Sequence, residues 1–193
     1  MTDTVQTLRH EVGRKTVHLS TLVLPAWAYW GPEAWRQRGL LLAFFFGLGL
    51  DLLRLYWPPC GRWMRARIGR YLRADEEARL VSAHYLTLAA VVLGWTVPRA
   101  IAAAALGYLV LGDAAAALVG RRFGRHRVWG KSLEGSLACF LCCLVLGWML
   151  LPGRPLAVFG GALVATLAEA LPLPVDDNWS VPLLSAAALV ALA

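Results

Sequence analysis

The chain contains 193 residues, of which 59% are hydrophobic and 16% are charged, and its mean hydropathy is +0.57. This composition excludes an ordinary soluble domain and predicts an integral membrane protein. The net charge of +7 does not indicate a nucleic-acid partner, because the basic residues are distributed as in the loops of membrane proteins.

Seven apolar runs account for most of the chain, and a spanning helix needs about 20 residues to cross about 30 Å of hydrocarbon. The runs cover residues 16–34, 38–57, 80–97, 99–119, 134–152, 155–173 and 179–193. The last run is the shortest and ends at the C-terminus. We therefore expect an all-α, polytopic transmembrane helix bundle of about seven spans, which forms a single integral membrane domain over residues 1–193.

The distribution of Lys and Arg predicts the orientation of these spans. If the N-terminus is cytoplasmic, fifteen of the 19 basic residues lie on the cytoplasmic side, and the other side keeps Arg36, Arg38, Arg99 and Arg154. Such an excess is typical of cytoplasmic loops. We expect a multi-pass protein with its N-terminus inside, its C-terminus outside and its active site facing the cytoplasm.

Residues 1–15 are predicted to form an interfacial helix that leads into the first span. They mix acids with bases and lack the apolar core and cleavage site of a signal peptide. On a helix, Glu11, Lys15 and His18 share one face, with Arg14 beside them. This polar stripe is either a Glu–Lys pair with snorkelling bases or an anion-binding surface.

Polar residues in and after the second span favour structural roles. Asp51 and Arg54 are three residues apart and share a helix face, which predicts an ion pair because neither charge is stable alone at that depth. The stretch 58–79 is too charged to span and is expected to lie on the cytoplasmic interface. His84 begins the third span and is expected to be a hydrogen-bonded structural histidine.

The fourth span is rich in alanine, at positions 102–105 and 114–117. Small residues let helices approach closely, so we expect this span at the centre of the bundle. Asp113 is a lone acid in this otherwise apolar run, and an ionised carboxylate there is costly unless a cation or a metal ion neutralises it.

Residues 120–133 are predicted to form a cytoplasmic phosphate-binding loop. Its GRHRVWGKS segment nearly matches a P-loop, but the spacing is one residue too long and a transmembrane helix replaces the preceding strand. We therefore reject the P-loop fold, whereas Lys131 can still bind a phosphate that the flanking backbone amides cradle. Ser132 and Glu134 also fit a helix N-cap with an acid in the first turn.

Two glycines of this loop allow a further interpretation. Gly120 and Gly124 have the spacing of a helix-dimerisation motif, which leaves a homodimer open. Arginines lie between them, so a backbone turn or close approach of a phosphate is the preferred interpretation.

The cysteines of the fifth span, Cys139, Cys142 and Cys143, include a C-x-x-C pattern, and the fourth cysteine is Cys60. The pattern lies in an apolar helix without histidine or further thiols, so we interpret these residues as small buried hydrophobes. The sequence requires no disulfide and no zinc site.

Acidic residues gather at the end of the sixth span and in the loop after it. Glu169 is expected at the inner membrane face, and Asp176, Asp177 and Asn178 follow in a loop after two prolines. Loop acids are commonly only solvated, but a carboxylate pair with an amide also suits Mg²⁺ and its retained waters.

These motifs occur together in one known family. The chain resembles the CTP-dependent lipid-alcohol kinases, which include dolichol kinase, phytol kinase and the CTP-using diacylglycerol kinase. The resemblance runs from Glu11 to Pro182 and rests on Glu11-x-x-Arg14-Lys15-x-x-His18, Gly112-Asp113 with Gly120 and Gly124, Lys131-Ser132-x-Glu134-Gly135, Glu169 and Asp176-Asp177-Asn178. Phytol-kinase-like members often carry a second acid where this sequence has Ala117.

The resemblance implies transfer of the γ-phosphate of CTP to the hydroxyl of a membrane lipid alcohol, such as a polyprenol, a phytol-like isoprenoid or diacylglycerol. Phosphoryl transfer needs Mg²⁺ ligands, phosphate-binding cations and an oriented alcohol. The candidates for metal binding are Asp113, Glu134, Asp176 and Asp177, and those for phosphate binding are Arg14, Lys15, Arg121 and Lys131. Glu11, His18, Glu169 and Asn178 are expected as supporting or nucleotide contacts, with Gly112, Gly120, Gly124, Ser132 and Gly135 shaping the nucleotide site. Asp113 is the first candidate for the base and His18 the second.

Two other functions fit parts of the sequence. The central stretch also resembles the phosphatidate cytidylyltransferases, although the chain lacks their later aspartate-rich signature. A small transporter is also a polytopic bundle with buried charges, but transporters place binding groups near the bilayer midplane. Here the polar candidates fall toward one face, which favours the kinase.

Overall fold

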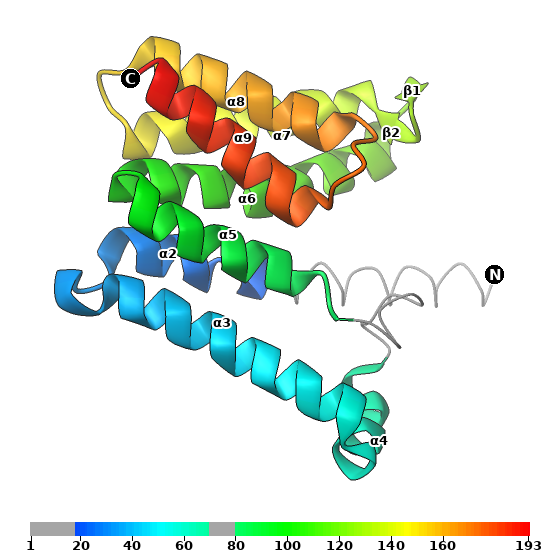
Figure 1. Ribbon diagram of the computed structural model, residues 1–193. Coiled ribbons are helices and arrows are strands. Elements are labelled where there is room, and N and C mark those ends of the chain that lie inside the picture. Colours follow the sequence, from blue (N-terminus) through cyan, green and yellow to red (C-terminus); the bar gives the residue numbers. More distant parts are fainter. Residues whose placement is uncertain (1–17, 70–79) are drawn as a thin grey trace.

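The computed structural model describes residues 18–69 and 80–193, and it is almost entirely helical, as expected for the all-α class (Figure 1). The helices are α2 (Val23–Trp30), α3 (Glu33–Tyr56), α4 (Pro58–Ile68), α5 (Ala83–Thr96), α6 (Arg99–Phe123), α7 (Leu133–Leu150), α8 (Pro155–Ala170) and α9 (Asp177–Ala191). Two short strands, β1 (Arg127–Val128) and β2 (Lys131–Ser132), form an antiparallel hairpin between α6 and α7.

Among the described residues, three helices are long and apolar enough to cross a membrane, namely α3, α6 and α7. The helices α5 and α8 are apolar but shorter. Each of the seven apolar runs recognised in the sequence contains one helix. The boundary between the first two differs from the expectation, because the chain turns at Gly31 and Pro32 and α3 begins at Glu33 rather than at residue 38.

Prolines and capping residues fix where several helices begin. Pro32 and Pro98 occupy the cap positions before α3 and α6, and Pro155 is the first residue of α8. A proline lacks the N–H that the first helical turn leaves without a partner, so it starts a helix at little cost. Asp176 caps α9 with its side chain, which accepts a hydrogen bond from the backbone N–H of Asn178 at 2.9 Å.

The centre of the bundle is α6, as its alanine content predicts. Every residue from Ile101 to Val110 is buried, and α6 packs against α2, α5, α7, α8 and α9. The small side chains at 102–105 let the neighbouring helices approach closely. Asp113 therefore lies on the central helix of the bundle, three residues after its fully buried stretch.

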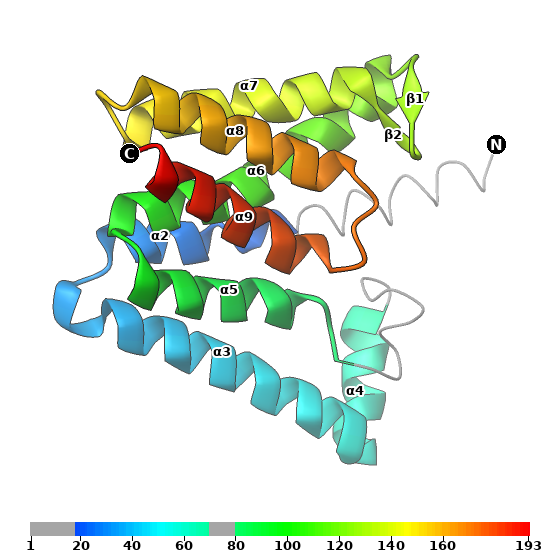
Figure 2. The ribbon, with the colours of Figure 1, turned by 45° about the horizontal axis from the view of Figure 1, so that its top comes forward.

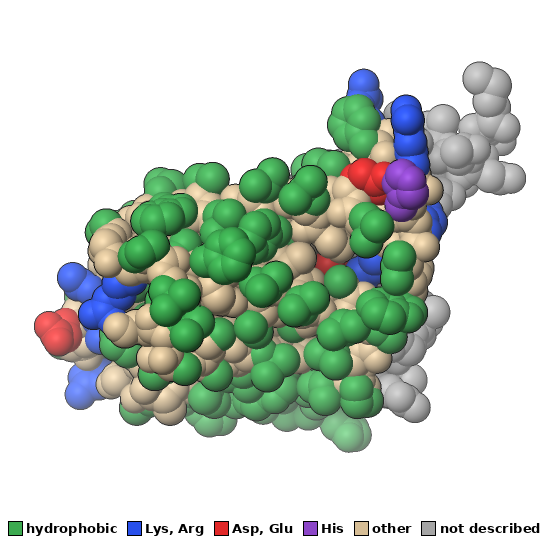
Figure 3. Space-filling view, turned by 90° about the horizontal axis from the view of Figure 1, so that it is seen from above, with side chains coloured by type: hydrophobic (Ala, Val, Ile, Leu, Met, Phe, Trp, Pro, Cys, Tyr) green, Lys and Arg blue, Asp and Glu red, His purple; other side chains and the backbone are tan. Residues whose placement is uncertain are grey.

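Large apolar side chains cover the outside of the bundle. On α3, Leu42, Phe45 and Phe46 are more than 60% exposed, and Figure 3 shows a face covered by hydrophobic side chains between two ends where charged residues gather. Exposed apolar surface of this extent is expected where hydrocarbon replaces water as the solvent. The arrangement agrees with the membrane protein that the composition predicts.

The helix connections lie at two opposite ends of the bundle (Figure 1 and Figure 2). The β-hairpin, α4, the start of α5 and the α8–α9 segment lie at one end, which we call the hairpin end. The opposite end holds the C-terminus and the α2–α3, α5–α6 and α7–α8 connections. The four basic residues assigned to the non-cytoplasmic side belong to elements or connections of that opposite end: Arg36, Arg38, Arg99 and Arg154.

The predicted ion pair between Asp51 and Arg54 is present and buried. The Nε atom of Arg54 lies 2.5 Å from Oδ1 of Asp51, and the residues are 2% and 5% exposed. Oδ2 of Asp51 accepts a hydrogen bond from the Val81 N–H at 2.8 Å and lies 3.0 Å from Nε2 of His84. This cluster connects α3 to the start of α5, so His84 is the structural histidine that was expected.

The stretch 120–133 is not a loop throughout. Helix α6 continues to Phe123, and the hairpin occupies residues 127–132. The helix continues because Arg121 and Arg122 are good helix formers whose charges favour a helix C-terminus. In the stretch 58–79, the described part forms α4 with Pro58 at its start, and residues 70–79 lie outside the described part.

The cysteines agree with their interpretation as small hydrophobes. Cys139 and Cys143 are buried, Cys60 and Cys142 are half-buried, and all four are free thiols. Gly112 packs directly against two of them, since a Cβ atom there would lie 2.8 Å from Sγ of Cys139 and 3.1 Å from Sγ of Cys143. Gly112 is therefore a helix-packing residue, and the structure does not bring it to the nucleotide site expected for it.

Candidate functional site

Helices α6 and α7 pack closely against each other at the hairpin end. A Cβ atom on Gly120 would lie 2.6 Å from Oγ of Ser132, and one on Gly135 would lie 2.7 Å from the carbonyl oxygen of Ala116. Gly124 packs against the same serine. The glycines therefore serve contacts within the chain, which is the close approach that their spacing allowed.

Ser132 fixes the start of α7. Its Oγ accepts a hydrogen bond from the N–H of Gly135 at 3.1 Å, and the Leu133 N–H donates to the carbonyl of His126 at 2.9 Å. Ser132 is thus the N-cap that was considered from the sequence. The cap holds the hairpin against the end of α6.

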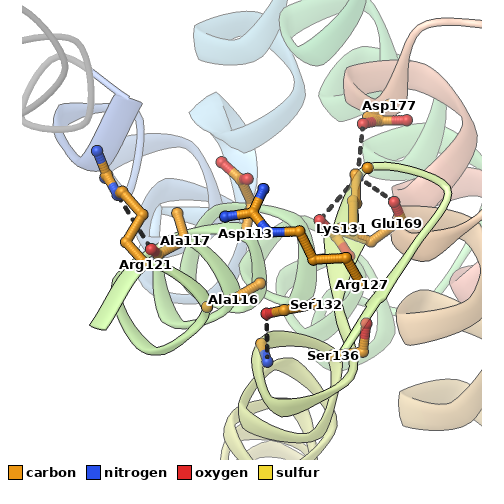
Figure 4. Close-up of a pocket in the computed structure, with 13 residues that line it drawn as sticks. Asp113, Ala116, Ala117, Arg121, Arg127, Lys131, Ser132, Ser136, Glu169 and Asp177 are labelled. Carbon is orange, nitrogen blue, oxygen red and sulfur yellow. Dashed lines mark hydrogen bonds and ion pairs between the residues drawn. The ribbon is translucent and has the colours of Figure 1, made fainter. Parts of the chain in front are cut away.

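A pocket of about 420 Å³ opens between the hairpin, α6, α7 and the facing ends of α8 and α9 (Figure 4). It is lined by eight residues that the sequence assigned to the site: Asp113, Gly120, Arg121, Lys131, Ser132, Gly135, Glu169 and Asp177. They come from stretches more than 60 residues apart in the chain. The fold therefore brings most of those sequence candidates that the structure describes into one cavity.

Lys131 is at the centre of an ionic cluster in this pocket. Its Nζ lies 2.7 Å from Oε1 of Glu169 and 3.4 Å from Oδ2 of Asp177, and it also donates to the backbone carbonyl of Glu169. Burial lowers the pKa of the Lys131 ammonium, but the hydrogen bond to Glu169 and the charges of both acids outweigh this effect, so its pKa is raised. Lys131 is therefore a cation at neutral pH.

Glu169 is the most buried acid of the pocket. It is 5% exposed, and its Oε2 atom has no hydrogen-bond partner among the described residues. A buried carboxylate oxygen is normally hydrogen-bonded. The second oxygen of Glu169 therefore offers an acceptor position at the wall of the pocket.

Asp113 lies on the α6 wall next to the start of the described chain. Its Oδ2 atom is 3.4 Å from Nε2 of His18. The structure thus brings together the two residues that the sequence named as first and second candidates for the base.

Three other candidates, Glu134, Asp176 and Asn178, make hydrogen bonds outside the pocket. Glu134 faces the α6–β1 connection, where Oε1 lies 2.9 Å from Nδ1 of His126 and accepts from its backbone N–H at 3.3 Å. Asp176 caps α9, and the side-chain amide of Asn178 donates to the Ser82 carbonyl at 3.4 Å. None of the three lines the pocket, because successive residues at a helix start point in different directions.

Glu11, Arg14 and Lys15 lie outside the described residues. Five other residues that line the pocket were not assigned to the site from the sequence: Ala116, Ala117, Arg127, Gly130 and Ser136. The small residues carry no chemical signal of their own. Arg127 could have been found from its position five residues before the Ser132 cap, if the intervening hairpin had been recognised.

The pocket suits a divalent cation only together with a ligand. No group of three His, Cys, Asp or Glu side chains in the described ranges is arranged to hold a metal ion. Mg²⁺, however, is commonly bound by one or two carboxylates and by substrate phosphates. Asp113 and Asp177 line the same cavity and fit that smaller requirement.

An apolar helix bundle with an ionic pocket at one end is the architecture of a membrane protein with a polar cavity. Comparison with known proteins identifies relatives of this chain. The chain is 26% identical to the CTP-dependent diacylglycerol kinase of Saccharomyces cerevisiae, with 92% of this chain and 71% of the relative covered. It is 29% identical to the CTP-dependent diacylglycerol kinase of Eremothecium gossypii, with 92% of this chain and 66% of that relative covered.

A third relative is the dolichol kinase of Schizosaccharomyces pombe, which is 32% identical over 52% of this chain and 22% of its own length. The chain therefore spans about two thirds of the diacylglycerol kinases but only a small part of the dolichol kinase. These relatives confirm the resemblance to CTP-dependent lipid kinases that the motifs indicated. No protein-family model and no solved structure matches the chain.

Proposed function

We propose that this protein is a kinase that transfers the γ-phosphate of CTP to the hydroxyl of a membrane lipid alcohol. The observation that carries the proposal is the pocket at the hairpin end of an apolar bundle, which Asp113, Lys131, Glu169 and Asp177 line together. The names of the relatives support both the donor and the lipid acceptor. Diacylglycerol, a polyprenol and a phytol-like alcohol are the acceptors to be tested.

In the proposed reaction, the lipid hydroxyl oxygen bonds to the γ-phosphorus of CTP. The bond between that phosphorus and the β–γ bridging oxygen breaks, and CDP leaves with the bond electrons. The hydroxyl proton passes to the carboxylate of Asp113, the acid that lies deepest along its helix. His18, with Nε2 at 3.4 Å from Asp113, orients this carboxylate and stabilises it electrostatically.

The remaining candidates would bind the nucleotide. Lys131 is a point charge for phosphate oxygens, and the backbone amides at the start of α7 lie where a helix N-terminus favours an anion. Glu11, Arg14 and Lys15 would extend this surface from the N-terminal segment. The homodimer that the glycine spacing left open is not part of the proposal, because Gly120 packs against Ser132 and Gly135 of its own chain.

Mg²⁺ would be held by Asp113 and Asp177 together with the nucleotide phosphates, and when bound it neutralises charge on the transferred group. Glu169 would position Lys131 rather than bind the metal, because its Oε1 is already 2.7 Å from the ammonium. Glu134 and Asp176, also named as metal ligands from the sequence, would act through the contacts that fix the hairpin and α9.

We place the hairpin end in the cytoplasm, with seven spans and an external C-terminus. This proposal is supported by the position of most of the described Lys and Arg residues on elements of the hairpin end and by the position of the C-terminus at the opposite end (Figure 1). Reporter fusions test it: a reporter after Ala193 should be active only outside the cytoplasm, and one inserted in the hairpin only inside.

The decisive experiment uses two samples of CTP, one labelled at the α-phosphate and one at the γ-phosphate, each with purified protein, Mg²⁺ and a lipid extract. Label from the γ-position should enter lipid with release of CDP, while label from the α-position should not. Transfer of α-label with release of pyrophosphate would instead establish the cytidylyltransferase alternative. No transfer of either label, together with movement of a solute across vesicles, would favour a transporter.

Donor choice is tested in the same assay. CTP should be a much better donor than ATP, and removal of Mg²⁺ with EDTA should abolish transfer. Equal rates with both nucleotides would remove CTP from the proposal while leaving lipid phosphorylation standing.

A further inference from the structure

The cations of the pocket are in different situations. Among the described residues, Arg121, Arg127 and Lys131 are the basic side chains that line it. Lys131 is held by Glu169 and Asp177. The Nε atom of Arg121 donates to the Ala117 carbonyl at 3.1 Å, along its own helix, and its guanidinium points away from Asp113 (Figure 4).

Arg127 differs from both. Its side chain extends into the pocket and its guanidinium points toward the Asp113 carboxylate (Figure 4). Within the described part of the chain, this guanidinium has no hydrogen-bonded or ion-paired partner. A guanidinium with five donors that faces a cavity is well suited to grip an incoming phosphate with two parallel hydrogen bonds.

The hairpin fixes the base of this side chain. Arg127 is paired with Ser132, and Val128 with Lys131, across a two-residue turn in which Trp129 and Gly130 have φ angles of 52° and 83°. Positive φ at both turn positions matches the twist of a tight hairpin, although a bulky residue such as Trp129 rarely adopts it. The chain keeps this strained turn next to the pocket, as is common at functional sites.

We propose that Arg127 binds the γ-phosphate of the nucleotide and stabilises its charge during transfer. The inference rests on the proposed function, because the γ-phosphate is the group that must face the acceptor hydroxyl and therefore Asp113. A guanidinium that points toward Asp113 contacts that phosphate before it contacts the α- or β-phosphate. Arg127 thus belongs to the residues that touch the reacting group, whereas Lys131 holds the nucleotide from the α8–α9 side.

The test compares Arg127→Ala and Arg127→Lys with Arg122→Ala as the matched control. Arg122 is close in sequence, but its guanidinium stacks over the Phe123 ring, with Cζ 5.6 Å from the ring centroid.

 The Arg122 guanidinium therefore covers an aromatic ring and is not part of the pocket lining. All variants are purified in detergent as monodisperse protein, and kcat, KM for CTP and the inhibition constant of CDP are measured.

Arg127→Ala should lower kcat by about 10²-fold or more, the size of effect seen when a group that stabilises transition-state charge is removed. It should weaken CTP binding but leave CDP inhibition close to wild type, because CDP has no γ-phosphate. Arg127→Lys keeps the charge without the fork and should recover part of kcat. Arg122→Ala should stay within about twofold of wild type, as a surface substitution outside the site.

The outcomes separate this inference from the proposed function. A wild-type protein that transfers no γ-label overturns both. An active wild type with Arg127→Ala at full kcat overturns only the role of Arg127. An equal loss of CTP and CDP affinity in Arg127→Ala overturns it as well, because that result means the hairpin supports the whole nucleotide rather than its terminal phosphate.

Discussion

Two ionic clusters in this protein each contain an acid that is 5% exposed, yet they are built differently. In the first, both oxygens of Asp51 have partners, namely Arg54, the Val81 N–H and His84, at 2.5 to 3.0 Å. In the second, Oε1 of Glu169 binds Lys131 at 2.7 Å, while Oε2 has no hydrogen-bond partner among the described residues. The first cluster is saturated, and the second keeps capacity for a ligand.

The cavities beside the two clusters differ in the same direction. The cavity at Asp51 measures about 180 Å³ and has mostly apolar walls, such as Leu50, Met64 and Val81. The cavity at Glu169 measures about 420 Å³ and is lined by six charged side chains among the described residues. Buried charge alone does not mark a site in this fold. Incomplete pairing next to a polar cavity does, and substitutions can test this distinction.

The largest effect is expected from Asp51→Asn, and it should fall on stability. The change leaves the buried Arg54 without its counter-charge, and breaking a buried pair in this way costs about 3–5 kcal/mol. Thermal unfolding in detergent should shift strongly downward, while kcat per folded molecule should stay near wild type. Combining Asp51→Asn with Arg54→Met removes both charges and should recover much of the loss. A normal melting temperature in the single variant would contradict the structural role.

Asp113→Asn should show the reverse pattern. The amide keeps the shape of the side chain but cannot accept the hydroxyl proton or supply negative charge, so kcat should fall by at least about 10²-fold. The melting temperature should hardly change, because Asp113 faces a cavity rather than a saturated cluster. The measurement is kcat beside thermal unfolding for the same monodisperse sample. Retention of wild-type kcat would move the centre of the site toward Asp177.

This contrast also explains what the sequence could predict. Asp51 and Arg54 were recognised as a pair because a spacing of three places both on one helix face. The positions of Asp113 and Lys131 in one site followed from the motif resemblance, and the pocket agrees with it. The helices themselves followed from hydrophobic runs of spanning length.

Other features depended on contacts that no local pattern contains. The hairpin was missed because its turn residues are Trp129 and Gly130, not the common Asn-Gly pair. With it, the role of Arg127 was missed. Two adjacent acids, Asp176 and Asp177, looked equivalent in sequence, but the first caps α9 and only the second lines the pocket.

Lys131→Ala should have an intermediate effect, because it changes both stability and binding. It leaves Glu169 as a buried acid without its cation, and it removes a charged phosphate contact worth about 1.5–3 kcal/mol, or roughly tenfold to a hundredfold in apparent CTP affinity. The double change Lys131→Met with Glu169→Gln should restore stability without restoring CTP affinity. Restoration of both properties would mean that Lys131 is only a structural partner of Glu169.

The smallest effect is expected from the three cysteines of α7, the helix that packs against the α6 helix of Asp113. Cys142 is half-buried on an apolar helix, so Cys142→Ala removes one polarisable atom from a surface that hydrocarbon can cover. Both kcat and KM for CTP should stay within about twofold of wild type, as for substitutions that touch no named mechanism. Thiol alkylation of the wild type should likewise spare activity unless it reaches Cys139, which packs against Gly112 next to Asp113. Cys142→Ala therefore tests whether the catalytic region extends into α7. A large loss of kcat would mean that it does. The difference between the saturated cluster at Asp51 and the open cluster at Glu169 would then no longer account for function by itself.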